Sequence, residues 1–172
     1  MLVHTPMRRS AREIRDVKEI RAVVGECQTV RLGLLDEEGI FIVPLNFGFE
    51  WLDDEAGEDV SLVLYVHSAQ EGRKVRALDA LAMGDGKLAI ELDLEDGLLP
   101  SEDPNKCSYA YRSIMGTATV SKLQGVEEKS HALDLLMWHH TKREWPGYSA
   151  PVMSHTNLYR LEVDYLTCKK NG

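Results

Sequence analysis

The residues with the clearest chemical potential lie in one stretch, Tyr65-Val66-His67-Ser68-Ala69-Gln70-Glu71-Gly72-Arg73-Lys74. An imidazole and a hydroxyl end an alternating apolar run, a glycine turn follows, and two adjacent cations open the next helical pattern. Because a helix dipole disfavours cations at the N-terminus, their position there indicates an anion that offsets them, and a phosphate fits this set of donors. The alternative is a solvated helix start, which Glu71 favours because it adds a negative charge at the same place.

A second feature is the segment Val43-Pro44-Leu45-Asn46, in which a proline interrupts a strand-like alternation. The interruption leaves backbone groups unpaired, and these can bond to the edge of a planar heterocycle. The alternative interpretation is a bulged edge strand.

Other catalytic or metal-binding patterns are weak or missing from the sequence. His139 and His140 are adjacent and so diverge on a helix, and neither has a His or Cys four residues further on, so we expect no metal site. The sequence contains no G-x-S-x-G elbow, no G-x-G-x-x-G and no Walker loop. Serine hydrolases, Rossmann-type dinucleotide binding and P-loop chemistry therefore lack their signatures.

Hydrophobic periodicity predicts the elements that must position these residues. Helical spacing predicts three helices, over 16–25, 73–81 and 125–140, and alternation predicts six strands, near 29–35, 41–49, 60–66, 87–93, 109–123 and 157–168. We expect an acidic hairpin tip at 52–59, an acidic loop at 94–105 and a loop after residue 140 that Pro146 and Pro151 break. Pro44 indicates an edge or a bulge, and Gly116 indicates a bulge or a close backbone approach. Most connections are of hairpin length, which favours a mainly β, antiparallel barrel with peripheral helices over a parallel doubly wound sheet.

Length and composition limit the remaining possibilities. The chain has 172 residues, 44% of them hydrophobic, which predicts a single domain over residues 1–172. Its net charge of −8 opposes binding to nucleic acid or to an anionic membrane. Three separated cysteines and the lack of a long apolar segment favour a cytoplasmic protein, neither secreted nor membrane-spanning. The strand at 41–49 is apolar on both faces, which predicts that a second copy covers one face in a homodimer.

The sequence also resembles a known family along nearly its whole length. The matching segments are Met7-Arg8-Arg9, Arg12-Glu13-Ile14, Arg31-Leu32, Val43-Pro44-Leu45-Asn46-Phe47-Gly48, His67-Ser68-Ala69, Glu71-Gly72-Arg73-Lys74 and Tyr111-Arg112-Ser113. In their order and spacing they resemble the nitroimidazole-resistance (Nim) branch of the pyridoxamine 5'-phosphate oxidase-like flavoproteins. Phe49 departs from this pattern, because the branch often has a tyrosine after the Phe-Gly pair.

This resemblance implies an FMN-binding split barrel, a homodimer with two flavins at the subunit interface. By position, Arg73 and Lys74 match the pair that binds the FMN phosphate, and His67 and Ser68 lie beside it. The other expected cofactor contacts are the backbone of Val43, Pro44, Leu45 and Asn46 along the isoalloxazine, and Ser113 near the phosphate.

The function implied is an FMN-dependent oxidoreductase. We expect it to take electrons from a nicotinamide donor, NAD(P)H, and pass them to a small organic acceptor such as a nitroaromatic. The flavin supplies the redox chemistry, and His67 is the candidate catalytic residue because an imidazole near the flavin can deliver a proton to the reduced substrate. The alternatives are a flavin-binding or sensing module without turnover, and a split barrel that binds haem.

Overall fold

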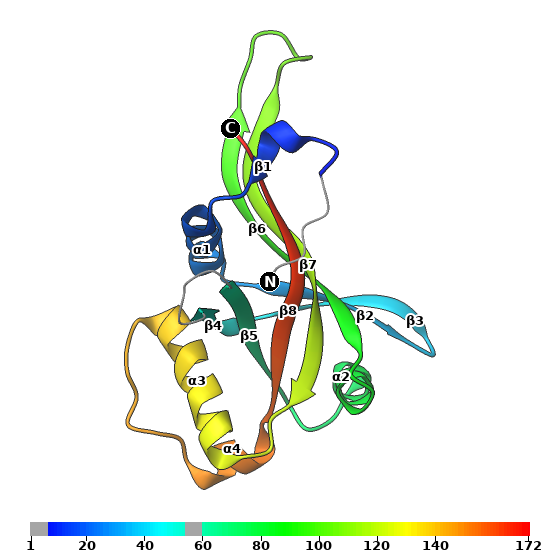
Figure 1. Ribbon diagram of the computed structural model, residues 1–172, viewed down its shortest axis with the longest axis vertical. Helices are drawn as coiled ribbons and strands as arrows, with labels where there is room; N and C mark the ends of the chain where they lie inside the picture. Colours follow the sequence, from blue (N-terminus) through cyan, green and yellow to red (C-terminus); the bar gives the residue numbers. More distant parts are fainter. Residues whose placement is uncertain (1–6, 54–59) are drawn as a thin grey trace.

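Antiparallel strands dominate the computed structural model, which describes residues 7–53 and 60–172 (Figure 1). The helical elements are η1 (Ser10–Arg12), α1 (Val17–Glu26), α2 (Arg73–Met83), α3 (Val126–Thr141) and α4 (Ala150–His155). The strands are β1 (Glu13–Ile14), β2 (Val30–Asp36), β3 (Gly39–Leu45), β4 (Phe47–Asp53), β5 (Val60–Ser68), β6 (Lys87–Leu99), β7 (Ser108–Lys122) and β8 (Asn157–Asn171). The prediction of a mainly β, antiparallel protein with peripheral helices is confirmed.

The eight strands form one sheet in the order β3-β2-β6-β7-β8-β5-β4, with β1 paired to β8. The prediction of six strands is wrong for two reasons. β1 is only two residues long and has no alternation of its own. The predicted strand at 41–49 is two strands, because Asn46 leaves the ladder and β3 and β4 pair with different neighbours.

This break at Asn46 closes the sheet on itself. β3 and β4 lie at opposite ends of the strand order, yet one residue joins them, so the sheet curls into a barrel whose seam is at Asn46. The Asn46 side-chain amide donates to the backbone carbonyl of Gln28 at 3.2 Å and so ties the seam to the start of β2. Pro44 lies on the edge strand β3, as its missing N–H predicts.

Two groups of buried side chains stabilise this arrangement. The larger one fills the barrel with buried residues of seven strands, all except β3, and α1 and α2 add Val23, Val24 and Leu78 to it. The smaller one lies on the other face of β5, where Val63 and Tyr65 pack with Ala132 and Leu133 of α3. β5 is therefore covered on both faces, and only its last residues are free to line a site.

Two loop predictions need correction, and a third falls mostly outside the described residues. β6 continues to Leu99, past a register shift between Glu95 and Gly97, so only the second half of the acidic segment 94–105 is loop. Pro151 opens the short helix α4, where a proline in the first turn removes no hydrogen bond. Residues 54–59 of the expected acidic tip lie outside the described residues, although the β4–β5 ladder leads towards them.

Gly116 is a point of close backbone approach, as the sequence predicts. A Cβ at this position would lie 2.2 Å from the carbonyl oxygen of Tyr165, so no other residue fits. The register between β7 and β8 shifts just beyond it, between Thr117 and Ala118.

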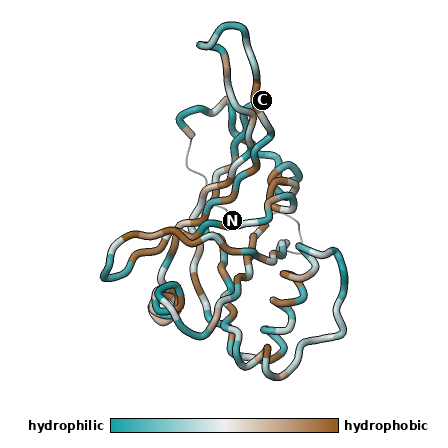
Figure 2. The backbone as a smooth tube through the Cα atoms, turned by 180° about the vertical axis from the view of Figure 1, so that it is seen from behind, coloured by the Kyte–Doolittle hydropathy of each residue, from teal (hydrophilic) through white to brown (hydrophobic). Residues whose placement is uncertain are grey.

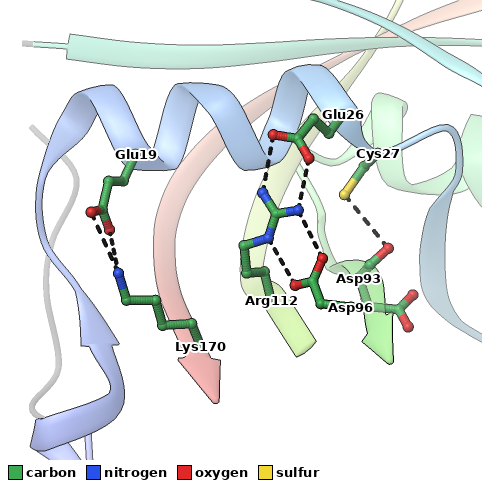
Figure 3. A network of polar contacts seen from close by, with 7 residues as sticks. All are labelled: Glu19, Glu26, Cys27, Asp93, Asp96, Arg112 and Lys170. Carbon is green, nitrogen blue, oxygen red and sulfur yellow. Dashed lines mark hydrogen bonds and ion pairs between the residues drawn. The ribbon is translucent and has the colours of Figure 1, made fainter. Parts of the chain in front are cut away.

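A polar cluster attaches α1 to the sheet (Figure 3). Asp16 caps α1 and accepts from the backbone N–H of Lys18 at 2.7 Å. At the other end of the helix, Arg112 of β7 donates to both oxygens of Glu26, at 3.0 and 2.7 Å, and to both oxygens of Asp96, at 2.9 Å each. One guanidinium therefore joins the end of α1 to the register shift in β6.

The β2–β3 hairpin projects from the sheet, and its strands are hydrophobic while its tip is hydrophilic (Figure 2). Leu35, Ile40 and Ile42 are 68%, 83% and 67% exposed on its outer face. Such an apolar surface is unusual on a protein that functions alone. Among the described residues no helix is long and apolar enough to cross a bilayer.

Candidate functional site

The candidate site begins at the C-terminal end of β5, where the two faces of the strand separate His67 from Ser68. Ser68 is 4% exposed and faces inward, and His67 lies on the other face with a surface open to solvent. Among the described residues no group hydrogen-bonds to the Ser68 hydroxyl. The Ser68 hydroxyl can therefore form a hydrogen bond with a ligand.

The chain then turns into α2 through Gly72, which has a φ of +125° that side-chain-bearing residues rarely adopt. No side chain caps α2, so the first backbone N–H groups of this eleven-residue helix keep their capacity to donate. The first turn contains no acidic residue, and Arg73 and Lys74 are its first two residues. Uncapped N–H groups and cations together form an environment that attracts an anion.

Arg73 is held by an acidic partner that the sequence interpretation missed. Its guanidinium donates to both oxygens of Asp36 at 2.7 Å, to the Gly39 carbonyl at 3.2 Å, and lies 4.0 Å from the ring centroid of Phe41. These hydrogen bonds raise the pKa of Arg73 and lower the pKa of Asp36. Arg73 therefore anchors α2 to the β2–β3 turn, and only Lys74 remains uncommitted.

Lys74 lies partly buried and forms no ion pair with the part of the chain that the structure describes. Burial lowers its pKa, because desolvation disfavours the charged form. Burial also lowers the pKa of His67, and the charges of Lys74 and His140 lower it further. The lowered pKa of His67 favours its neutral imidazole, and Lys74 has no counter-ion among the described residues.

The segment from Val43 to Asn46 reaches this site along the barrel seam. Phe47 pairs with Val66, so Asn46 lies beside the end of β5 that carries His67. Pro44 and Asn46 are exposed, whereas Val43 and Leu45 are half-buried. Since β3 is an edge strand, the backbone groups on its free side remain available for a planar ligand.

His140 is a neighbour of the site that the sequence interpretation did not assign to it. Its Nδ1 lies 3.0 Å from the Gln28 Oε1, while its Nε2 is buried and has no hydrogen-bond partner among the described residues. The sequence offers no signal for this, because only the barrel seam brings α3 and the start of β2 to His67.

Ser113 is not brought to this site within one chain. Ser68 pairs with Asn157 of β8, whereas Ser113 pairs with Lys169 of the same strand, twelve residues further on. At about 3.3 Å per residue, the two serines are roughly 40 Å apart along the strand. The described residues contain no group of three or more side chains arranged to hold a metal ion.

Comparison with known proteins places this geometry in a family. The family model described as pyridoxamine 5'-phosphate oxidase matches residues 16–170. The chain belongs to this family. No curated protein matches it significantly.

Solved structures are also similar to this chain. A candidate 5-nitroimidazole antibiotic resistance protein from Bacteroides thetaiotaomicron is 30% identical, with 92% of this chain and 86% of that chain covered and a TM-score of 0.73. The resemblance to the nitroimidazole-resistance branch is thus confirmed. The flavocytochrome Anf3 from Azotobacter vinelandii (18% identity, 97% and 72% covered) and an FAD and heme binding protein from Mycobacterium smegmatis (17% identity, 92% and 72% covered) have the same fold, both with a TM-score of 0.73.

Proposed function

We propose that the chain is an FMN-binding oxidoreductase that passes electrons from a nicotinamide donor to a small organic acceptor. The observation that carries this proposal is the cation Lys74, which has no ionic partner among the described residues, at the uncapped start of α2 and near the hydroxyl of Ser68 and the imidazole of His67. A phosphate supplies the negative charge that this set of donors lacks.

The names of the similar structures support a flavin as the group that carries the phosphate. Two of them are a flavocytochrome and an FAD and heme binding protein, and the more similar protein is named for resistance to a nitroaromatic drug class. When bound, the flavin supplies the electron transfer itself.

The residues of this chain then bind the cofactor, orient its ring system and transfer a proton. Lys74 and the first N–H groups of α2 bind the phosphate, and Arg73 positions α2 through Asp36. The free edge of Val43, Pro44, Leu45 and Asn46 orients the ring system. His67 takes a proton from solvent and delivers it to the substrate, and its lowered pKa makes the protonated form a stronger acid.

The apolar outer face of the β2–β3 hairpin supports a homodimer as the functional form. Ile40 and Ile42 are largely exposed on β3, the strand that leads to the seam at Asn46. A second copy that buries this face also shields the adjacent site from water, which places the flavin at the subunit interface.

The test is the visible spectrum of the purified protein, followed by titration with FMN. We expect a flavin spectrum, and quenching of FMN fluorescence when FMN is added to protein stripped of flavin. Arg73→Ala/Lys74→Ala removes the charge-assisted contact of Lys74, worth about 1.5–3 kcal/mol, together with the Arg73–Asp36 anchor of α2, and should weaken FMN more than riboflavin, which lacks the phosphate. A colourless protein that leaves FMN fluorescence unquenched contradicts the proposal.

Two alternatives have distinct outcomes in the same preparation. A yellow protein that oxidises no nicotinamide donor with any of a panel of acceptors is a flavin-binding or sensing module. A Soret band in place of flavin absorbance indicates haem, which the two haem-associated neighbours favour.

A further inference from the structure

A second cluster of cations lies at the opposite end of β8 from the site described above. Arg8, Arg9 and Arg12, in and before η1, line a cavity of about 300 Å³ together with Lys169 of β8 and Tyr111 of β7. Figure 1 shows the N-terminal segment and β1 beside the C-terminal part of β8. The residues that line the cavity come from these segments and from β7. No acidic residue lines it.

The sheet places further donors on the same face. Lys169 Nζ lies 5.5 Å from the ring centroid of Tyr111, so the ring faces the same cation. Ser113 pairs directly with Lys169 and follows Tyr111 by two residues, so its side chain lies on the face that carries both. Ser113 is therefore next to this cation cluster and far from Lys74.

Two acidic residues that the sheet places opposite Lys169 and Ser113 have ion-pair partners of their own. Glu13, which pairs with Lys169 across the strands, binds Arg15 at 2.7 Å. Asp93, which lies opposite Ser113, forms an ion pair with Arg31.

The four cations that line the cavity have no such partner. Within residues 7–53 and 60–172, none of Arg8, Arg9, Arg12 and Lys169 forms an ion pair. Four cations that have no acidic partner among the described residues repel one another at short range, and an anion removes that repulsion.

We propose that this cavity is a second anion site, separate from the Lys74 site within the chain, and that it binds the phosphate or diphosphate group of a small phosphorylated ligand. Guanidinium groups match phosphate oxygens with two parallel hydrogen bonds, and three of the four cations are arginines. A cavity of about 300 Å³ is at the small end of ligand sites, which fits a phosphate or diphosphate group better than a whole cofactor. The site does not depend on flavin binding.

The test is calorimetric titration with inorganic pyrophosphate in the Arg73→Ala/Lys74→Ala background, in which the first anion site is removed. We expect saturable binding that weakens as salt is added. Adding Arg9→Ala/Arg12→Ala should weaken it by on the order of tenfold or more, because two charge-assisted donors are lost. Lys18→Ala/Lys106→Ala, which removes two exposed cations elsewhere, should leave it unchanged.

Several outcomes overturn the proposal. It is wrong if millimolar pyrophosphate produces no binding, or if the Arg9/Arg12 and Lys18/Lys106 variants weaken binding equally. It is also wrong if RNA or anionic vesicles bind through Arg9 and Arg12 and pyrophosphate does not compete.

A measurement on the unsubstituted, flavin-saturated chain covers the case in which a variant fails to fold. Pyrophosphate should shift the amide resonances of Arg9, Arg12 and Tyr111 but not that of Lys74. Loss of FMN binding alone, with these shifts retained, contradicts the proposed function and leaves the second site standing.

Discussion

Arg73 and Lys74 are adjacent in sequence but have different partners in the structure. Arg73 is engaged by Asp36, which lies 37 residues earlier, whereas Lys74 has no ionic partner among the described residues. The sequence shows two cations at a helix start, and it cannot show that one of them is neutralised, because the β2–β3 turn reaches Arg73 only in the folded barrel. The prediction of the phosphate site therefore depends mainly on Lys74.

This difference predicts unequal effects for the two single variants. Lys74→Ala should weaken FMN binding by about 1.5–3 kcal/mol, the range for a hydrogen bond to a charged group, without a large change in thermal stability. Arg73→Ala should lower the melting temperature more, because it releases α2 from Asp36, and should affect FMN less. Fluorescence titration and thermal melts of both variants measure this. The reverse order of the two effects on FMN affinity would show that Arg73 leaves Asp36 for the phosphate.

His139 predicts a loss of stability on acidification. Its ring is 3% exposed and packs against Phe47 and Phe49, with centroid distances of 4.9 and 5.0 Å, while Nε2 lies 2.7 Å from the Cys27 carbonyl. Burial lowers its pKa. Because the unfolded chain then binds the proton more readily, the folded state loses free energy as pH falls below the unfolded pKa of about 6.5.

Urea denaturation at a series of pH values measures the effect. We expect the free energy of unfolding to decrease by up to about 1.4 kcal/mol per pH unit for this group. His139→Gln should flatten the profile but not abolish it, since the pKa of His67 is lowered as well. A profile unchanged by the substitution would show that folding does not lower the pKa of His139.

At the scale of elements, close packing of α3 on β4 depends on Gly48. A Cβ at Gly48 would lie 2.4 Å from the backbone nitrogen of Leu136 and 2.7 Å from the backbone carbon of Leu135. Gly48→Ala must therefore push α3 away from the strand, and we expect it to cost at least about 1–3 kcal/mol. Gly84→Ala is the control, because its Cβ meets nothing closer than 3.8 Å. Similar urea midpoints for the two variants would contradict the tight contact.

The Arg112 cluster of Figure 3 should contribute more than an ordinary surface ion pair. Arg112 is bidentate to both Glu26 and Asp96, and it lowers the pKa of each. Arg112→Met leaves the two carboxylates without their shared cation, and we expect the melting temperature to fall by about 2–4 °C or more. Lys170→Met, which breaks a single pair with Glu19 in the same view, should change it little. Equal changes in melting temperature would mean that the ion pairs of Arg112 stabilise the fold no more than an ordinary surface ion pair does.

The sequence predicts the elements that have a long, uninterrupted hydrophobic pattern. It does not predict strand boundaries that depend on pairing with distant strands. The helices over 16–25, 73–81 and 125–140 and the long strands β7 and β8 occur where periodicity predicts them. The sequence does not reveal the division between β3 and β4, because the apolar alternation continues across Asn46 while the pairing partner changes. β6 extends through acidic residues that local composition assigns to a loop, because pairing with β7 stabilises them.

At the scale of the whole molecule, the exposed face of the β2–β3 hairpin predicts self-association. Ile40→Asp/Ile42→Asp places two carboxylates on that face, and burying them in a symmetric interface is costly because each meets apolar surface. We expect analytical ultracentrifugation to show a dimer for the unsubstituted chain and a monomer for the variant, with FMN bound more weakly. Leu98→Asp, at another exposed apolar residue, is the matched control and should remain dimeric. A monomeric unsubstituted chain would contradict the dimer.

The single-residue connection at Asn46 also couples the alignment of two strand pairs, β2–β3 and β4–β5. The register of β3 is set by its pairing with β2, and the register of β4 by its pairing with β5. Only Asn46 lies between β3 and β4, so neither strand can shift without the other. A slip of one position in either ladder would have to be absorbed by the other, and it would turn every inward side chain outward. Lengthening the chain by one residue after Asn46 would free the two ladders to shift separately, so the correct pairing of the whole barrel depends on the shortness of this one connection.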